Sequence, residues 1–253
     1  MVEPIMDIER VRMAEERLVN VWPAPSTLLM DGWVVRFGHG YSGRANSASA
    51  IVIGAPMSVA LIGTIETLYK EAGLPPCVRI TPLADAAVEP MLIQRGYVLK
   101  DQSRMMLAGL DASRKVMADP RIRIEGAASR RWLAGVSVRQ EPSKRSADHL
   151  FAIVGHLRVP AAFATLEIAG EAVGFGMAAI DRGWAEIGSV MLDEAHRGKG
   201  LGRGIVDALL AWAVQEGADC AFLQVTAENN VARKLYGSQG FSDLCGYKTL
   251  IRL

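Results

Sequence analysis

The sequence predicts an α/β protein in which a mixed, largely antiparallel sheet is flanked by helices. Short apolar runs typical of strands alternate with amphipathic helical patterns along most of the 253 residues. One of the strand-like runs, from Ile187 to Leu192, leads through a glycine-rich basic loop into a helical pattern. A similar order of elements occurs towards both ends of the chain, which predicts two domains.

The first half alternates regularly between the two patterns. The segment from Ile5 to Val19 has the periodicity of an amphipathic helix. We expect further helices at Val59 to Ala72 and Ala84 to Gln94, and strands at Trp33 to Phe37, Asn46 to Ile53, Cys77 to Ile80 and Tyr97 to Leu107.

The second half begins with a short strand, Arg121 to Ile124, after the polar stretch from Asp111 to Pro120. Apolar runs on either side of Ala169-Gly170-Glu171 predict a β-hairpin. The remaining expected elements are helices at Arg131 to Val138 and His149 to Leu157, hairpin strands at Ala162 to Ile168 and Ala172 to Ile180, strands at Trp184 to Leu192 and Cys220 to Val225, a helix after the glycine-rich loop, and a short helix after Asn229.

A weak internal repeat relates the two halves. Gly96-Tyr97 and Gly240-Phe241 lie 144 residues apart, and the same offset places Gly73 on Gly217. The elements between these glycines follow the same order in both halves: helix, strand, helix, strand. The repeat predicts two tandem domains; the alternative is that two α/β halves share such a pattern by chance.

The glycine-rich loop, Arg197-Gly198-Lys199-Gly200-Leu201-Gly202-Arg203-Gly204, is suited to binding phosphate. Glycines let backbone N–H groups gather around an anion, and a helix N-terminus adds unpaired donors and partial positive charge. The loop matches neither the P-loop pattern nor the dinucleotide pattern G-x-G-x-x-G. It does match R-x-x-G-x-G; the alternative interpretation is a basic surface turn.

A second motif, N-x-x-A-x-x-L-Y-x-x-x-G-F, runs from Asn229 to Phe241. The two motifs together resemble the signatures of the GNAT superfamily, the acyl-coenzyme-A-dependent N-acyltransferases. The resemblance implies two GNAT-like domains in tandem, each a mostly antiparallel sheet flanked by helices. Residues 1–115 would form a degenerate N-terminal domain, and residues 116–253 the catalytic domain that binds acetyl-CoA.

The degenerate character of the first domain rests on the repeat. At the offset of 144 residues, Leu92 stands where Tyr236 is and Asp85 stands where Asn229 is. The segment Ala55-Pro56-Met57-Ser58, before the corresponding helix, has no glycine-rich basic loop. We therefore expect a GNAT-like fold there that has lost its cofactor site.

The resemblance also implies the cofactor contacts in the second domain. The pyrophosphate of acetyl-CoA would bind the loop, and the peptide-like pantetheine arm would pair with the end of the preceding strand. Asn229 would hydrogen-bond the pantetheine arm. The expected cofactor-binding residues are Val190, Met191, Leu192, Arg197, Gly198, Lys199, Gly200, Leu201, Gly202, Arg203 and Asn229.

The implied reaction is direct attack of an amine on the thioester. Glu186, a carboxylate on an otherwise apolar strand, would take the proton of the amine directly or through water. Tyr236 would protonate the departing thiolate, since a phenol stays protonated at neutral pH. The alternatives are an exposed glutamate beside Arg182 and a tyrosine that only packs on its helix. Covalent catalysis by Cys220 or Cys245 is not expected, because neither has a histidine nearby in sequence.

One N-terminal segment resembles a stretch found in some tandem GNAT proteins, D-G-W followed by G-Y-S-G-R-A-N-S. Tyr41, Arg44 and Asn46 of this segment could contact the substrate between the domains. The alternative is a structural hairpin whose polar side chains satisfy a buried turn.

The composition limits the kinds of partner and the cellular location that we expect. A net charge of +1 and the lack of a basic stripe argue against nucleic acid, and no apolar run approaches the length of a membrane helix. The 3 scattered cysteines fit a reducing cytoplasm, and the 4 histidines show no metal-ligand spacing. We expect a cytoplasmic monomer or homodimer, with no metal, acting on a small-molecule or peptide amine. The alternative function is a catalytically weak module that binds or senses acyl-CoA.

Overall fold

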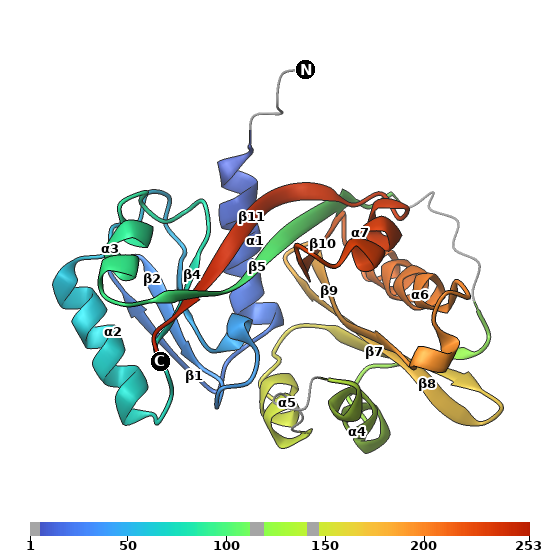
Figure 1. Cartoon of the computed structure of the whole chain (residues 1–253). Helices are drawn as coiled ribbons and strands as arrows, with labels where there is room; N and C mark the ends of the chain where they lie inside the picture. Colours follow the sequence, from blue (N-terminus) through green and yellow to red (C-terminus); the bar gives the residue numbers. More distant parts are fainter. Residues whose placement is uncertain (1–5, 112–118, 141–146) are drawn as a thin grey trace. The chain divides into compact units, whose positions relative to one another are not determined.

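The computed structural model describes residues 6–111, 119–140 and 147–253 (Figure 1). The chain forms two compact units. Unit 1 comprises Met1–Met106, Gln224–Asn230 and Asp243–Leu253; unit 2 comprises Leu107–Leu223 and Val231–Ser242. The predicted boundary between residues 115 and 116 lies outside the described residues, and the division into domains 1–115 and 116–253 stays a prediction.

Unit 1 is built on a mixed sheet in the order β1-β2-β3-β4-β11-β5. Its elements are α1 (Ile8–Val21), β1 (Ser26–Met30), β2 (Trp33–Phe37), β3 (Ala48–Ala50), α2 (Val59–Glu71), β4 (Cys77–Ile80), α3 (Val88–Gln94), most of β5 (Val98–Gly109) and most of β11 (Ser242–Ile251). β3 and β4 are parallel, and the β1–β2, β2–β3 and β4–β11 pairs are antiparallel.

Unit 2 continues the strand order as β5-β10-β9-β8-β7-β6. Its elements are β6 (Ile122–Glu125), α4 (Arg130–Arg139), α5 (Ala147–Val154), β7 (Ala161–Ile168), β8 (Glu171–Asp181), β9 (Trp184–Leu192), the 3-10 turn η3 (Glu194–His196), α6 (Leu201–Gln215), most of β10 (Cys220–Thr226) and most of α7 (Asn230–Gly237). The β6–β7, β7–β8 and β8–β9 pairs are antiparallel, whereas β9 and β10 are parallel.

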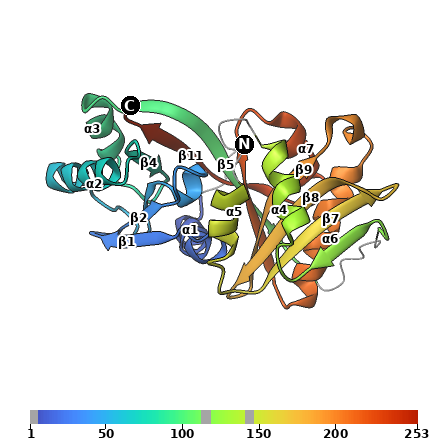
Figure 2. The same cartoon turned by 90° about the horizontal axis from the view of Figure 1, so that it is seen from below.

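Helices cover both faces of β8 in unit 2, because small residues let them approach. A Cβ at Gly174 or Gly176 would lie within 3 Å of side-chain atoms of Ile205 on α6. The neighbouring residue, Phe175, points to the opposite face, where Gly135 of α4 leaves room for its ring. Figures 1 and 2 show α6 on one side of β7–β9 and α4 on the other.

The last strand of the second half, β11, lies mostly in unit 1, and the end of β5, the last strand of the first half, lies in unit 2. β11 pairs with β4 in unit 1, from Lys248↔Ile80 to Ile251↔Cys77. The end of β5 belongs to unit 2, where the Leu110 amide donates to the Asp219 carbonyl at 2.8 Å. At the offset of 144 residues the element pairs α2 and α6, β4 and β10, α3 and α7, and β5 and β11 correspond.

Several element bounds differ from the sequence-based expectation for local reasons. The third strand is only Ala48–Ala50, because Asn46 Oδ1 accepts hydrogen bonds from the Gly38 and Gly40 amides and holds a loop before it. The helix expected from Ala84 begins at Val88, because the Asp85 carboxylate accepts from the Ala87 amide and forms a turn. β1 was not expected from the sequence, and Ile5, the expected start of the first helix, lies outside the described residues.

Candidate active site

The strand before the glycine-rich loop has a bulge. Met177 on β8 pairs with Gly188 on β9, but Phe175 pairs with Met191, so β9 carries one extra residue. Ser189 adopts a left-handed φ of +51° at this point. A bulge bends a strand and increases its twist, which changes the direction of the backbone that follows.

The pairing of β9 with β10 is short. It runs from Cys220↔Trp184 to Phe222↔Glu186, whereas β9 continues to Leu192. The backbone from Ile187 onward is therefore not part of the β9–β10 ladder. This is the strand end where the pantetheine arm was expected to pair, and Val190, Met191 and Leu192 are partly exposed there.

The loop itself needs glycine at two positions. Gly198 and Gly200 have φ values of +73° and +75°, in the left-handed region where a side chain is strained. No described atom would lie within 4 Å of a Cβ added at either position. The two glycines are therefore required by backbone conformation and not by packing of the described residues.

Helix α6 begins without a side-chain cap. Gly200 occupies its N-cap, whereas Asp7, Ser58 and Ser129 cap α1, α2 and α4 through side-chain oxygens. Within the described residues, the first turn of α6 thus keeps amide donors that a capping side chain would otherwise take. Together with the helix dipole, this makes the turn suitable for binding an anion.

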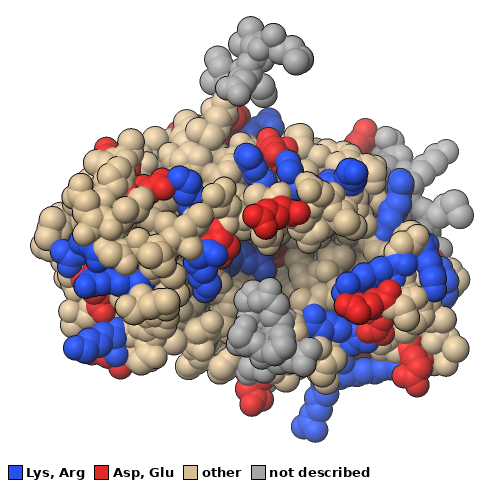
Figure 3. Space-filling model, in the orientation of Figure 1, with Lys and Arg blue, Asp and Glu red and all other residues tan. Residues whose placement is uncertain are grey.

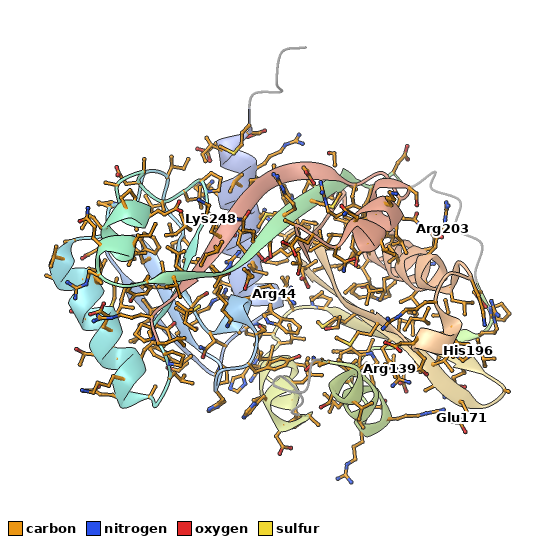
Figure 4. All side chains as sticks on the ribbon, in the orientation of Figure 1. Arg44, Arg139, Glu171, His196, Arg203 and Lys248 are labelled. Atoms are coloured by element: carbon orange, nitrogen blue, oxygen red, sulfur yellow. The ribbon has the colours of Figure 1, made fainter. Side chains whose placement is uncertain are left out.

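Three basic side chains of the loop are exposed. Arg197 lies 3.4 Å from Glu194, and the Arg203 guanidinium lies 3.6 Å from Asp207 one turn along α6. Lys199 Nζ donates to the Ala195 carbonyl at 2.9 Å. Figure 4 labels Arg203 near the start of α6, and Figure 3 shows acidic and basic groups interspersed on the face in view. The loop therefore offers full positive charges beside its backbone donors.

Tyr236 lies on a helix that packs against this loop. A Cβ at Gly202 would lie 3.5 Å from Leu235 Cδ1, so α7 contacts the first turn of α6 next to Tyr236. The Tyr236 ring meets Phe241 edge-on, with centroids 6.0 Å apart. The structure thus brings the helix that carries the predicted general acid beside the predicted pyrophosphate loop.

Glu186 is fully buried in the middle of the unit 2 sheet. It pairs with Ala179 on β8 and with Phe222 on β10, at the last step of the β9–β10 ladder. A Cβ at Gly188 would lie 3.0 Å from Glu186 Oε2, so this glycine leaves space for the carboxylate. The alternative of an exposed glutamate is wrong.

Asn229 belongs to unit 1, whereas the loop and Tyr236 belong to unit 2. It follows the end of β10, and its amide donates to the Thr226 carbonyl at 3.0 Å. Its predicted contact with the pantetheine arm stays a prediction.

The N-terminal segment with Tyr41, Arg44 and Asn46 forms a well-packed loop in unit 1. Tyr41 and Asn46 are buried, and Arg44 stacks on the Trp22 ring at 4.4 Å. These contacts and the two amides held by Asn46 favour the structural interpretation. A substrate role for the three residues stays a prediction.

In unit 1, backbone hydrogen bonds continue beyond the ladder of β3 and β4, the strands that correspond to β9 and β10. In unit 2, the β9–β10 ladder ends at Phe222↔Glu186. Beyond the β3–β4 ladder, Ala55 and Ala84 form a further parallel bridge. The Ala55 amide donates to the Leu83 carbonyl, and the Asp85 amide donates to the Ala55 carbonyl, both at 3.0 Å. These hydrogen bonds occupy backbone groups that a pantetheine arm would need.

The cysteines lie in covered positions. Burial raises the pKa of Cys77 to about 11 and that of Cys245 to about 12, and Cys220 Sγ donates to the Ala108 carbonyl. Across the described ranges, no set of three or more His, Cys, Asp or Glu side chains could hold a metal ion. Over the same ranges, no helix has the length and apolar character needed to cross a membrane.

Sequence reasoning missed a buried ion pair in unit 1. Arg79 and Glu15 are 1% and 2% exposed, and the guanidinium makes two hydrogen bonds of 2.9 Å to the carboxylate. The partners are 64 residues apart, and Gln224, which also contacts Arg79, is 145 residues away. No local pattern could reveal such a contact; a charged residue within an apolar strand was the one available signal.

The chain is similar to known acetyltransferases. A family model described as "Probable histone acetyltransferase Rv0428c C-terminal" matches residues 9–249. The chain is 26% identical over 253 residues to the "Uncharacterized N-acetyltransferase YobR" of Bacillus subtilis (strain 168), covering 94% of this chain and 96% of that protein.

Solved structures share the fold. A GCN5-related N-acetyltransferase from Kribbella flavida matches with a TM-score of 0.70 at 16% identity, over 98% of this chain and 96% of that chain. Another GCN5-related N-acetyltransferase, from Sphaerobacter thermophilus, matches with a TM-score of 0.59 at 17% identity, over 76% and 66%. With its bulged strand, uncapped glycine loop and near-complete match to the family model, the chain belongs to the Rv0428c C-terminal acetyltransferase family of the GNAT superfamily.

Proposed function

We propose that this acetyltransferase moves an acetyl group from acetyl-CoA to a primary amine by direct attack. The observation that carries the proposal is the loop from Arg197 to Arg203, with two left-handed glycines and an uncapped helix start directly after a bulged strand. An anion bound there would meet backbone donors, the helix dipole and three basic side chains.

The donor would lie along β9 and the loop. The pyrophosphate would bind the amides and basic side chains of residues 197–203. The pantetheine arm is peptide-like and would continue along the backbone of Val190 to Leu192, beyond the end of the β9–β10 ladder. Asn229 would add a hydrogen bond to the same arm.

The amine must lose a proton for the transfer. Its nitrogen would attack the thioester carbonyl, forming the C–N bond as the C–S bond breaks. Glu186 would take the amine proton, directly or through water, since a buried carboxylate is suited to general base catalysis. Its place at the last paired step of β9 and β10 supports this role.

The departing thiolate must gain a proton. Tyr236 would donate it, because a phenol remains protonated at neutral pH and has a basicity close to that of a thiol. The contact between α7 and the first turn of α6 supports placing Tyr236 near the donor.

The test is an acetyl-transfer assay with acetyl-CoA and a panel of primary amines, including polyamines, amino acids and lysine peptides. Release of free coenzyme A thiol together with an N-acetylated product would support the proposal. We expect Tyr236→Phe to lower turnover by about a hundredfold or more while acetyl-CoA binding stays unchanged. An unchanged rate would remove Tyr236 from the mechanism.

The alternative role is a module that binds acyl-CoA and acts as a sensor. Tight acetyl-CoA binding without transfer to any amine of the panel would favour it. The buried Glu186 supports the enzyme, because a sensor needs no base at that position.

We also propose that the protein acts in the cytoplasm, as a monomer or homodimer. Three free cysteines, two of them buried, fit a reducing compartment. The expected acceptor is a small-molecule or peptide amine, and size-exclusion chromatography with light scattering would give the oligomeric state.

A further inference from the structure

A single arginine on α4 contacts the strand end that leads into the glycine-rich loop. Arg139 is the last residue of α4 (Figure 4), and only 18% of its side chain is exposed. Its Nη1 donates to the Gly135 carbonyl at 2.9 Å, and its Nη2 donates to the Ala172 carbonyl at 3.1 Å and to Asp193 Oδ2 at 2.7 Å. All of these residues belong to unit 2, as do β9 and the loop.

The carboxylate that Arg139 binds lies between the strand and the loop. Asp193 follows the last residue of β9 and is the N-cap of η3. An aspartate in such a position usually accepts a hydrogen bond from an amide of the turn that it caps. The Asp193 side chain makes no such bond, and its carboxylate is bound to Arg139 instead. The Asp193 backbone is fixed as well, because its amide donates to the Val173 carbonyl and its carbonyl accepts from the His196 amide, both at 2.9 Å.

The guanidinium also contacts the strand opposite the bulge. Arg139 Cζ lies 4.8 Å from the centroid of the Phe175 ring, which is almost fully buried. Phe175 on β8 pairs with Met191 on β9, next to the register shift. Residues 190–192 therefore lie between two points that Arg139 holds: the bulge, through Phe175, and the start of the loop, through Asp193.

We infer that Arg139 is a positioning residue for binding of the acetyl donor, and this inference rests on the proposed function. Residues 190–192 are the segment along which the pantetheine arm would lie, and they are beyond the end of the β9–β10 ladder. A segment with few backbone hydrogen bonds opens locally at a low cost in free energy. Arg139 holds this segment at both ends, so less conformational entropy is lost when the arm binds.

The pyrophosphate end of the site depends on different contacts. Ile205 and Leu209 hold α6 on β8, where they pack over Gly174 and Gly176. These contacts lie on the face of the sheet opposite to the Phe175 ring. Loss of the Arg139 contacts should therefore affect binding of the pantetheine arm more than binding of the pyrophosphate.

Arg139→Met is the variant that tests the inference, because methionine is an unbranched side chain without hydrogen-bond donors. The two probes are acetyl-CoA and ADP. Both contain adenosine and a pyrophosphate, but only acetyl-CoA contains the pantetheine arm. Affinities would be measured by isothermal titration calorimetry on the full chain. Arg131→Met is the matched control, since Arg131 also lies on α4 but pairs with Glu167 on β7, a strand that does not neighbour β9.

We expect Arg139→Met to weaken acetyl-CoA binding by about five- to tenfold, the scale of one hydrogen bond, and ADP binding by less than about twofold. Arg131→Met should leave both affinities unchanged. Asp193→Asn keeps the shape of the side chain and should weaken acetyl-CoA binding by about two- to threefold, as for a partly exposed ion pair. The double variant should bind acetyl-CoA no more weakly than Arg139→Met alone, because both substitutions break the same contact.

The outcomes are distinct. If the wild-type chain does not bind acetyl-CoA, the proposed function fails and the inference fails with it. If the wild type binds but Arg139→Met binds equally well, the inference is overturned while the proposed function stands. An equal loss for acetyl-CoA and ADP would also overturn it, because that pattern indicates general damage to unit 2.

Two further results bear on the contact with Asp193. Losses of affinity that add in the double variant would overturn the connection through this carboxylate. If Arg139→Met does not fold, Asp193→Asn decides the question: a loss confined to acetyl-CoA supports the inference, and an unchanged acetyl-CoA affinity overturns it.

Discussion

Substituting Gly200 by alanine tests the loop most sharply. Gly200 has a φ of +75° at the N-cap of α6, and no described atom lies within 4 Å of the added Cβ. The cost to folding is therefore conformational alone, about 1–2 kcal/mol for a non-glycine residue in the left-handed region. The melting temperature should fall by about 2–4 °C for each kcal/mol in a chain of this size.

The substitution should also weaken binding of the donor, in addition to its effect on folding. If Gly200→Ala weakens acetyl-CoA binding tenfold, a ligand concentration of about 100 times the wild-type Kd stabilises the wild type by about 2.7 kcal/mol but the variant by only about 1.4 kcal/mol. The assay is thermal unfolding with and without acetyl-CoA.

Gly63→Ala serves as the control for Gly200→Ala. Gly63 lies inside α2 with nothing within 4 Å of an added Cβ, so alanine there should stabilise the fold by about 0.5–1 kcal/mol. Stabilisation by acetyl-CoA should stay at the wild-type value. Wild-type stabilisation of the Gly200→Ala variant by acetyl-CoA would refute the assignment of the loop.

Three further predictions concern the fold. Gly135→Ala should destabilise the protein by about 1–3 kcal/mol in urea unfolding, because its Cβ would lie 2.1 Å from Phe175 Cζ; a stable variant would contradict the packing of α4. Arg79→Met should lower the free energy of unfolding by about 3–5 kcal/mol, because it leaves the Glu15 charge buried without its partner. Adding Glu15→Leu should recover most of this loss. A double variant that is no more stable than the single one would contradict this. The pKa values of Cys77 and Cys245 are raised above the ordinary 9.0, to about 11 and about 12, so the folded state binds more protons above pH 9. The stability that the two neutral thiols contribute should be fully present below pH 9 and be lost as the pH rises through 11 to 12. In alkaline urea unfolding, a double alanine variant should lose less stability over that range.

Much of the fold could be predicted from sequence because its elements carry strong local patterns. The strands at Trp33–Phe37, Cys77–Ile80 and Trp184–Leu192 have the predicted bounds, and the helix expected from Val59 to Ala72 ends one residue earlier. The edge strand Ser26–Met30 was missed because it has no buried face that would impose a period of two.

The place of β11 in unit 1 could not be predicted from sequence. β5 and β11 correspond in the repeat. Their apolar patterns would fit pairing with a strand of the same half equally well. Pairing of distant strands depends on packing across the whole chain, which periodicity does not encode. For the same reason the partner of Arg79 in its buried ion pair, Glu15, could not be identified from sequence.

The candidate site was predictable where the chemistry is carried by consecutive residues. The left-handed conformations of Gly198 and Gly200 agree with a loop whose glycines are needed for backbone shape. The bulge at Ser189 was not predicted, because one extra residue in a strand leaves the apolar pattern almost unchanged. The burial of Glu186 depends on both neighbouring strands, and sequence alone left it open between a buried base and an exposed carboxylate.

The most direct test of the assigned donor site is a crystal structure of the protein with acetyl-CoA bound. We predict that the pyrophosphate lies against the amides of residues 198–203, with the pantetheine arm along Val190 to Leu192 and the thioester between Glu186 and Tyr236. Density for acetyl-CoA away from this loop, or beside Ala55 and Ala84 in unit 1, would contradict the account.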